Sequence, residues 1–123
     1  MAKPSVADPR SLLPLTPFAF QVLLALSDAP RHGYAIIREI DERTDGLIKL
    51  RTGTLYTLLQ RLLDEELIEE SDARPHPDDD DQRRRYYAVT AFGHDVMRAE
   101  ARRLEALVGE ARRKHVLGKS SKA

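Results

Sequence analysis

The sequence predicts a mainly helical domain in which a two-stranded hairpin lies between the third and the last of four helices. Two observations carry this prediction. Apolar residues recur every three to four positions in four segments of the 123-residue chain, which is the spacing of one face of an α-helix. Before the last of these segments lie two short runs of aliphatic and aromatic residues, separated by a polar, proline-containing loop, and this pattern is typical of a hairpin.

The composition excludes several classes of protein. There is no run of 18 apolar residues, so no membrane-spanning helix and no membrane partner are expected. The polar start of the chain has no signal-peptide core. Because cysteine is absent, disulfides, thiolate metal sites and cysteine nucleophiles are excluded. A cytoplasmic location is the default expectation.

The chain is expected to begin with an arm and two short helices. Residues 1–15 contain three prolines among polar residues and predict a flexible N-terminal arm. A first helix over 17–27 has Thr16 as its cap and is apolar nearly all round, so it should be buried on most sides. A second helix over 33–44 carries a stripe of isoleucines and ends before Gly46.

The third helix, over 52–65, has two contrasting faces. Five leucines cover roughly 140° of arc on one face. The other face holds short, hydroxyl-bearing or amide-bearing residues with one cation: Thr52, Gly53, Tyr56, Thr57, Gln60 and Arg61. An idle solvent face would be expected to carry Glu and Lys instead. The second face is therefore a candidate binding surface.

The last helix, over 91–114 with Thr90 as its cap, carries an apolar seam of about two heptads. The seam consists of Met97, Ala101, Leu104, Val108 and Ala111, and Leu107 widens it. An exposed seam implies a partner, and a second copy of the chain is the simplest one. The alternative is that the helix packs against the first helix of its own chain, and both arrangements can hold together.

Three short helices, a hairpin and a long helix follow one another in the order of a winged helix-turn-helix. We assign residues 16–90 to this domain, 91–115 to a C-terminal dimerisation helix and 116–123 to a disordered tail. Three motifs occur in order at the spacing of this fold: His32-Gly33-Tyr34, Gly53-Thr54-Leu55-Tyr56, and Arg85-Tyr86-Tyr87 followed by Thr90 and Gly93. Together they resemble the PadR family of transcriptional regulators over residues 15–110, in its small branch with a single C-terminal helix.

The resemblance implies a homodimeric regulator, most often a repressor, that binds an inverted repeat in double-stranded DNA and is released by a signal. Some members sense a small molecule at the dimer interface, so such an effector joins DNA and a second copy among the expected partners. Two positions depart from the family. Arg51-Thr52 stands where Ser-Pro is frequent, and Glu66 stands where glycine is usual. Because a positive φ at Glu66 would be strained, we expect a different turn there.

The polar face of the third helix suits base recognition, since the N-terminal part of a recognition helix meets base edges. Gln60 can pair bidentately with adenine and Arg61 with guanine. The methyl groups of Thr54 and Thr57 can contact thymine methyls, and Tyr56 can donate to a phosphate. His32 and Tyr34, at the start of the second helix, are expected to be structural.

Further cations flank this helix. Lys49 and Arg51 precede it, where phosphates would lie, although either could equally be an ordinary surface cation. Arg83, Arg84 and Arg85 border the wing, where they can bind phosphates. The alternative is that these arginines balance the four aspartates at 78–81, and we expect that acidic tip to point away from DNA.

Other functions find less support. The zero net charge and the acidic wing favour, as the alternative, a winged-helix protein-interaction module without DNA binding. A primary small-molecule binder is weaker. The histidine and aspartates of 76–81 do not match a calcium loop, so no metal site is expected. No nucleophile with a base, phosphate-cradling glycine loop or paired apolar carboxylate is present, so we expect neither an enzyme nor a cofactor.

Overall fold

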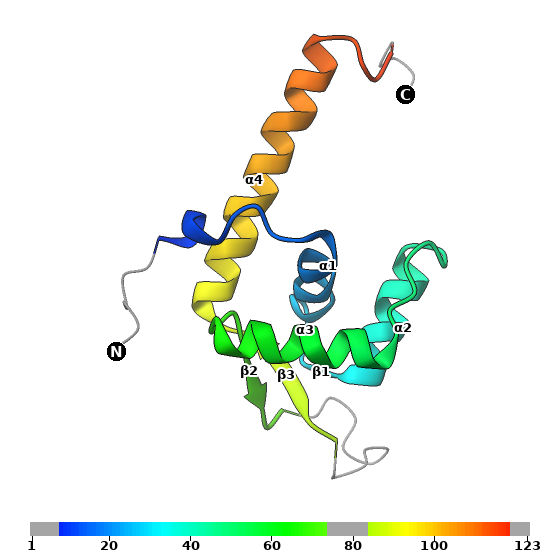
Figure 1. Ribbon diagram of the computed structural model, residues 1–123, viewed down its shortest axis with the longest axis vertical. Helices are drawn as coiled ribbons and strands as arrows, with labels where there is room; N and C mark the ends of the chain where they lie inside the picture. The colour runs from blue at the N-terminus through cyan, green and yellow to red at the C-terminus, as the bar shows by residue number, and fades with distance from the viewer. Residues whose placement is uncertain (1–7, 74–83, 119–123) are drawn as a thin grey trace.

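The computed structural model describes residues 8–73 and 84–118. Along them lie the 3-10 helix η1 (Pro9–Leu12), α1 (Pro17–Leu26), β1 (Arg31–His32), α2 (Gly33–Arg43), α3 (Thr52–Asp64), β2 (Ile68–Ser71), β3 (Tyr86–Val89) and α4 (Ala91–Arg113). The four expected helices and both strands of the expected hairpin are confirmed. Figure 1 shows α3 and the hairpin at one end of the molecule and the last turns of α4 at the other.

The core lies where α1, α2 and α3 meet, and the sequence explains why α1 is central to it. The Thr16 hydroxyl accepts a hydrogen bond from the Ala19 N–H at 3.1 Å and so begins the helix, with Pro17 in its first turn. Apolar side chains on most of its circumference, such as Val22 and Leu23, are fully buried. The leucine face of α3 packs against this core, below α1 in the view of Figure 1.

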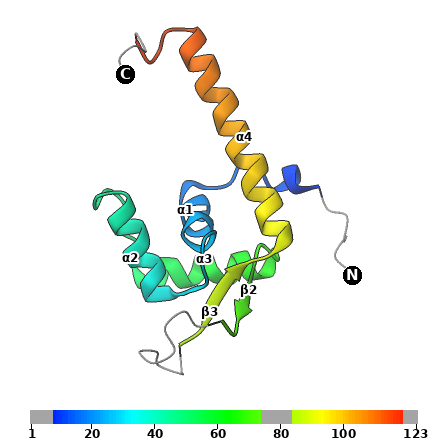
Figure 2. The same cartoon turned by 180° about the vertical axis from the view of Figure 1, so that it is seen from behind.

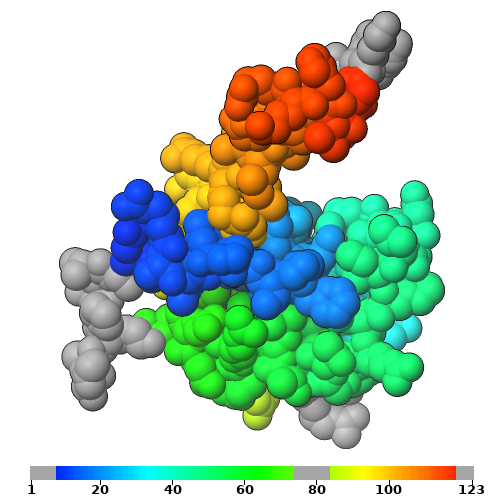
Figure 3. Space-filling model, turned by 45° about the horizontal axis from the view of Figure 1, so that its top comes forward, coloured from blue at the N-terminus to red at the C-terminus, as the bar shows by residue number. Residues whose placement is uncertain are grey.

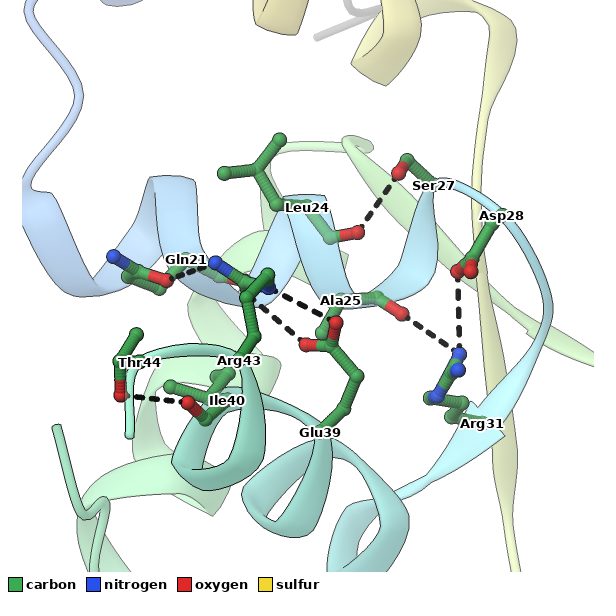
Figure 4. A network of polar contacts seen from close by, with 10 residues as sticks. All are labelled: Gln21, Leu24, Ala25, Ser27, Asp28, Arg31, Glu39, Ile40, Arg43 and Thr44. Atoms are coloured by element: carbon green, nitrogen blue, oxygen red, sulfur yellow. Dashed lines mark hydrogen bonds and ion pairs between the residues drawn. The ribbon is translucent and has the colours of Figure 1, made fainter. Parts of the chain in front are cut away.

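Polar contacts fix α2 across α1 (Figure 4). The Arg43 guanidinium in the last turn of α2 donates to the Gln21 side-chain oxygen of α1 at 2.8 Å, and it also pairs with Glu39 at 2.9 Å. After α1, Arg31 donates to the Ala25 carbonyl oxygen at 3.1 Å. These contacts join the last turn of α2, and the segment before α2, to α1.

A third strand, which the sequence did not predict, joins the hairpin. The sheet order is β1-β3-β2 with antiparallel pairing, and Arg31 lies opposite Tyr87 while Ile68 lies opposite Val89. A two-residue strand has no alternation pattern to detect, because it exists only through its pairing with β3. The strand attaches the start of α2 to the first half of β3.

The expectation of a different turn at Glu66 is wrong. Glu66 adopts a φ of 64°, the left-handed conformation that glycine takes without strain. Its N–H donates to the Leu63 carbonyl oxygen at 3.0 Å, and its own carbonyl oxygen accepts from the Thr90 hydroxyl at 2.7 Å. Hydrogen bonds to both the N–H and the carbonyl oxygen of Glu66 therefore impose the conformation on a residue that does not favour it.

The junction between the sheet and α4 depends on Thr90 and Gly93. The Thr90 hydroxyl accepts from the Gly93 N–H at 2.9 Å and begins α4, while it donates to the Glu66 carbonyl oxygen. A Cβ on Gly93 would lie 2.1 Å from the Leu67 carbonyl oxygen, so only glycine fits. The start of α4 is thus hydrogen-bonded to the segment that directly follows α3.

The two halves of α4 have different surroundings. Val96, Met97 and Glu100 in its first half are buried against the body of the domain. Figures 2 and 3 show its second half projecting away from that body. Although α4 has 23 residues, no helix in the described ranges is long and apolar enough to cross a membrane.

The described part of the expected arm, residues 8–15, is docked rather than extended. Leu15 is buried and η1 packs against α4. Glu100 forms a bidentate ion pair with Arg103, in which both N–O distances are 2.8 Å. These hydrogen bonds lower the pKa of Glu100, and a hydrogen bond from the Leu15 backbone adds to the effect. The leucines of the arm complete the core. The polar composition of residues 1–15 gave no indication of this packing.

Candidate nucleic-acid interface

The outer face of α3 is a continuous exposed surface. Its leucine face is buried, with Leu55, Leu59 and Leu62 at most 1% exposed. The residues predicted for binding on this helix are all exposed: Thr52, Thr54, Tyr56, Thr57, Gln60 and Arg61. A Cβ on Gly53 would meet no atom within 4 Å, and no side chain caps the first turn of α3. The N–H groups of that turn therefore face an open surface.

Tyr56 connects two of the sequence motifs. A Cβ on Gly33, the first residue of α2, would lie 2.4 Å from the Tyr56 hydroxyl oxygen. The glycine therefore leaves the space that the tyrosine ring occupies. With 47% of Tyr56 still exposed, its hydroxyl lies at the edge of the α3 surface beside the start of α2.

Two hollows extend the surface along α3. One is lined by Tyr56, Thr57, Gln60, Arg61 and Asp64. The other lies between α3 and the start of α1, where Phe18 is 44% exposed beside Thr57 and Arg61. Sequence reasoning missed Phe18, because α1 is apolar nearly all round and gave no sign of which side chain remains uncovered. It also missed Asp64, although the spacing of four residues from Gln60 was visible.

Four of the residues predicted to bind DNA already have an acidic partner in the same chain. The pairs are Gln60 with Asp64 at 3.0 Å, Arg61 with Glu65 at 3.7 Å, Lys49 with Asp41 at 3.0 Å, and Arg85 with Glu70 at 3.6 Å. Exposed pairs of this kind contribute only about 0–1 kcal/mol each. Another anion can therefore replace the carboxylates at little cost.

The base of the wing adds exposed arginines beside the start of α2. Arg84 and Arg85 are exposed, whereas Arg83 and the acidic segment 78–81 lie outside the described residues. A guanidinium nitrogen of Arg84 lies 3.1 Å from Nε2 of His32. The other ring nitrogen of His32, Nδ1, accepts from the Ala35 N–H at 3.2 Å and so caps α2. His32 is therefore structural as expected.

Two residues near the helix-turn-helix, Arg51 and Tyr34, complete the comparison with the sequence. Arg51 is exposed directly before α3, as its predicted role requires. The expectation that Tyr34 is structural is wrong, because 61% of this residue is exposed. Among the aromatic and cation–π contacts of the described residues, its ring has one, with the Arg38 guanidinium 5.9 Å from the ring centre.

The predicted seam on α4 divides into a covered and an open part. Met97 is 8% exposed and belongs to the core of its own chain, so it is not part of a free seam. For this half of α4, the alternative of packing within one chain is correct. Farther along, Leu104, Leu107 and Val108 are 36–54% exposed, Ala101 is exposed and Ala111 is half-buried. We call the five residues 101, 104, 107, 108 and 111 the α4 strip.

Comparisons with known proteins agree with this architecture. A family model described as the transcriptional regulator PadR-like family matches residues 22–99. The solved hsRosR-S4 complex, of RosR from H. salinarum, is 30% identical, with 89% of this chain and 90% of that chain covered and a TM-score of 0.63. A transcriptional regulator from Clostridium thermocellum is 25% identical, with 80% and 88% covered and a TM-score of 0.63.

A shorter match adds a curated relative. An uncharacterized protein X from Lysinibacillus sphaericus is 38% identical over 48 residues, which span 39% of this chain and 44% of that protein. The match thus covers less than half of the relative's length. The structural likenesses confirm the mainly helical, winged helix-turn-helix fold.

Proposed function

This chain belongs to the PadR-like family of transcriptional regulators, and on that basis we propose that it binds a specific DNA sequence as a homodimer, with α3 in the major groove. The observation that carries the proposal is the exposed outer face of α3, where hydroxyl and amide side chains predominate over the Glu and Lys residues of an ordinary solvent-exposed helix. A helix fits the major groove, where every base pair presents a distinct pattern of donors and acceptors.

The parts of this surface suit different parts of a DNA duplex. The uncapped N–H groups at the start of α3, near Thr52 and Thr54, can donate to a phosphate that the helix dipole also attracts. Gln60 and Arg61, farther along the same face, have the side chains that pair with adenine and guanine. Arg85 at the base of the wing can bind the phosphate backbone beside the groove.

Binding would exchange carboxylate partners for phosphates or, at Arg61, for a base edge. Lys49, Arg61 and Arg85 each have an acidic partner within the chain. Together with the net charge of zero, these pairs also favour the alternative, a winged-helix module that binds another protein and no DNA. The two functions differ in their salt dependence, because phosphate contacts release counterions and contacts to a neutral protein surface do not.

A salt titration of DNA affinity tests the proposal. We expect the logarithm of the binding constant to fall linearly with the logarithm of salt concentration, with a slope of about −0.9 for each phosphate bound. The double variant Arg84→Ala, Arg85→Ala should flatten the slope by about one to two. Arg113→Ala, which removes an exposed cation at the C-terminal end of α4, is the matched control and should leave the slope unchanged. Absence of salt-dependent DNA binding in the wild type would favour the interaction module.

Homodimerisation is supported by the α4 strip. The strip continues the face of α4 that packs on the domain core, but it has no cover among the described residues. A helix segment of this length is not stable on its own in water, which favours a second copy as its partner. Two-fold symmetry would place the two α3 helices about 34 Å apart, which fits an inverted repeat.

The dimer is tested by charged substitutions in the strip. Leu104→Glu with Val108→Glu should give monomers in sedimentation, because two carboxylates would be desolvated at the interface. Glu105→Gln, a change at a neighbouring exposed position outside the strip, should leave the dimer intact. A dimer that persists in the double variant would place the interface elsewhere.

Repression and release by a small molecule at the dimer interface complete the proposal, and they rest on the family resemblance. A reporter gene placed behind the bound DNA site should be expressed at a low level with the wild type. Expression should rise with the monomeric Leu104→Glu, Val108→Glu variant. Expression that falls in the variant instead would indicate an activator.

A further inference from the structure

The outer face of α3 ends in a carboxylate to which neither the sequence nor the family resemblance assigned a role. Asp64 is the last residue of α3 and lies one helical turn beyond Gln60. The Gln60 side-chain nitrogen, Nε2, donates to Oδ1 of Asp64 at 3.0 Å. Both side chains are exposed, and both line the hollow that Tyr56 and Arg61 also line. Asp64 is therefore within the surface proposed to meet base edges.

Helix stability does not account for an aspartate at this position. The carbonyl groups at the end of a helix carry partial negative charge, so a carboxylate in the last turn is unfavourable. Aspartate also has a weak intrinsic preference for helix. Asp64 is followed by a second carboxylate, Glu65, and Arg61 is the one basic residue of the last turn. Because the helix disfavours an aspartate at this exposed position, its contact with Gln60 is the better explanation for its presence.

The contact has a chemical consequence for Gln60. A glutamine amide has two N–H donors on one end and an acceptor oxygen on the other, whereas an ionised carboxylate only accepts. Asp64 therefore favours the amide orientation in which the nitrogen faces the carboxylate and the oxygen faces away. One N–H is used by this bond, and the second N–H and the Oε1 oxygen remain. An adenine contact needs that donor and that acceptor, for N7 and for the N6 amino group.

We propose that Asp64 is a positioning residue for base recognition, which holds the Gln60 amide in the orientation that reads adenine. The inference rests on the proposed function, since it requires that α3 enters the major groove. Asp64 also affects the affinity for DNA, and this second effect is unfavourable. Its charge repels the phosphate backbone, so it weakens binding to all DNA while it sharpens the choice of one base pair. Specificity is a difference between affinities and is improved by such an element.

The test is a double-mutant cycle on sequence discrimination. A preferred site is first selected with the wild type from a randomised duplex library, and affinity is then measured for that site and for duplexes with each base pair replaced. Gln60→Ala should reduce discrimination at one A·T pair by roughly tenfold, the value of one bidentate contact. Asp64→Ala should reduce discrimination at the same pair by at least about threefold. The double variant should lose no more than Gln60→Ala alone.

Two further variants separate positioning from charge and from folding. Glu65→Ala removes the same charge from the adjacent residue, which pairs with Arg61 and not with Gln60. It should raise affinity for all duplexes and leave the preference at the adenine pair intact. Asp64 makes a further contact besides Gln60, and the cycle with Gln60→Ala isolates the pair from that contact. Asp64→Asn, which keeps the size of the side chain but also offers a donor, should lose part of the discrimination.

The outcomes are distinct. If Asp64→Ala changes affinity for all duplexes by the same factor, as Glu65→Ala does, the positioning role is refuted and only a charge effect remains. Loss of discrimination at a different base pair, or additive losses in the double variant, would also refute it. A wild type that selects no site at all would instead refute the proposed function itself. Circular dichroism and thermal unfolding of each variant are the checks that the fold is retained.

Discussion

A glycine in place of Glu66 is expected to stabilise the protein. At its φ of 64°, a residue with a side chain bears about 1–2 kcal/mol of strain. Glycine removes that strain but makes the unfolded chain more flexible, which costs about 0.4–1 kcal/mol. The side chain is exposed, and the hydrogen bonds to Leu63 and Thr90 involve only backbone groups of residue 66. The midpoints of these two ranges differ by about 0.8 kcal/mol, which is the net gain we expect.

Thermal unfolding followed by circular dichroism measures this gain. A change of this size should raise the midpoint by about 2–6 °C in a domain of this length. The comparison is made at one protomer concentration, since the midpoint of a dimer depends on it. Glu66→Gln keeps the strain and removes the charge, so its midpoint should match the wild type. A destabilised Glu66→Gly variant, or an equal rise in Glu66→Gln, would refute the account based on strain.

The remaining predictions concern packing, pH and the α3 surface. Gly93→Ala should lower the free energy of unfolding by about 1–3 kcal/mol or more, because the added Cβ would meet a backbone carbonyl. As a control, Gly109→Ala should raise it by up to about 1 kcal/mol, because the added Cβ meets no atom and alanine favours the helix more than glycine does. The ion pair with Arg103 holds the pKa of Glu100 below its ordinary value, so the stabilisation that it provides is present at neutral pH and is lost as the pH falls below about 4. Unfolding measured across this pH range should show that Glu100→Gln is less stable than the wild type at pH 7 but loses less unfolding free energy on acidification. Equal pH profiles of the two proteins would contradict this. Gly33→Ala should displace the Tyr56 ring and weaken DNA binding with little change in the unfolding midpoint, and unchanged affinity would remove Tyr56 from the interface.

The helices were predictable from the sequence because their causes are local. The leucine spacing of α3 specifies which face is buried, and the caps at Thr16 and Thr90 are adjacent to the segments that they begin. The same spacing identified the exposed face of α3 as a surface. The i to i+4 spacing of Gln60 and Asp64 is equally local, but spacing alone does not show that the two side chains are hydrogen-bonded.

Features that depend on distant parts of the chain were not predictable in this way. The strand β1 exists only because Tyr86 and Tyr87 lie opposite it. The docking of residues 8–15 depends on leucines that meet α4 only in the folded chain. The conformation of Glu66 is imposed by hydrogen bonds on both sides of the residue. In each case tertiary contacts override the local preference, and no single-sequence pattern records them.

The hydroxyl of Thr90 links two helices with separate roles. It begins α4 and donates to the Glu66 carbonyl oxygen, two residues beyond the end of α3. A tilt of α4 at its first turn therefore either breaks this hydrogen bond or moves the end of α3 with it. In the dimer that we propose, this joint would connect the α4 strip of each subunit to its α3 helix. The distance between the two α3 helices would then depend on the contacts that Thr90 and Gly93 make with residues 66 and 67, away from both proposed interfaces.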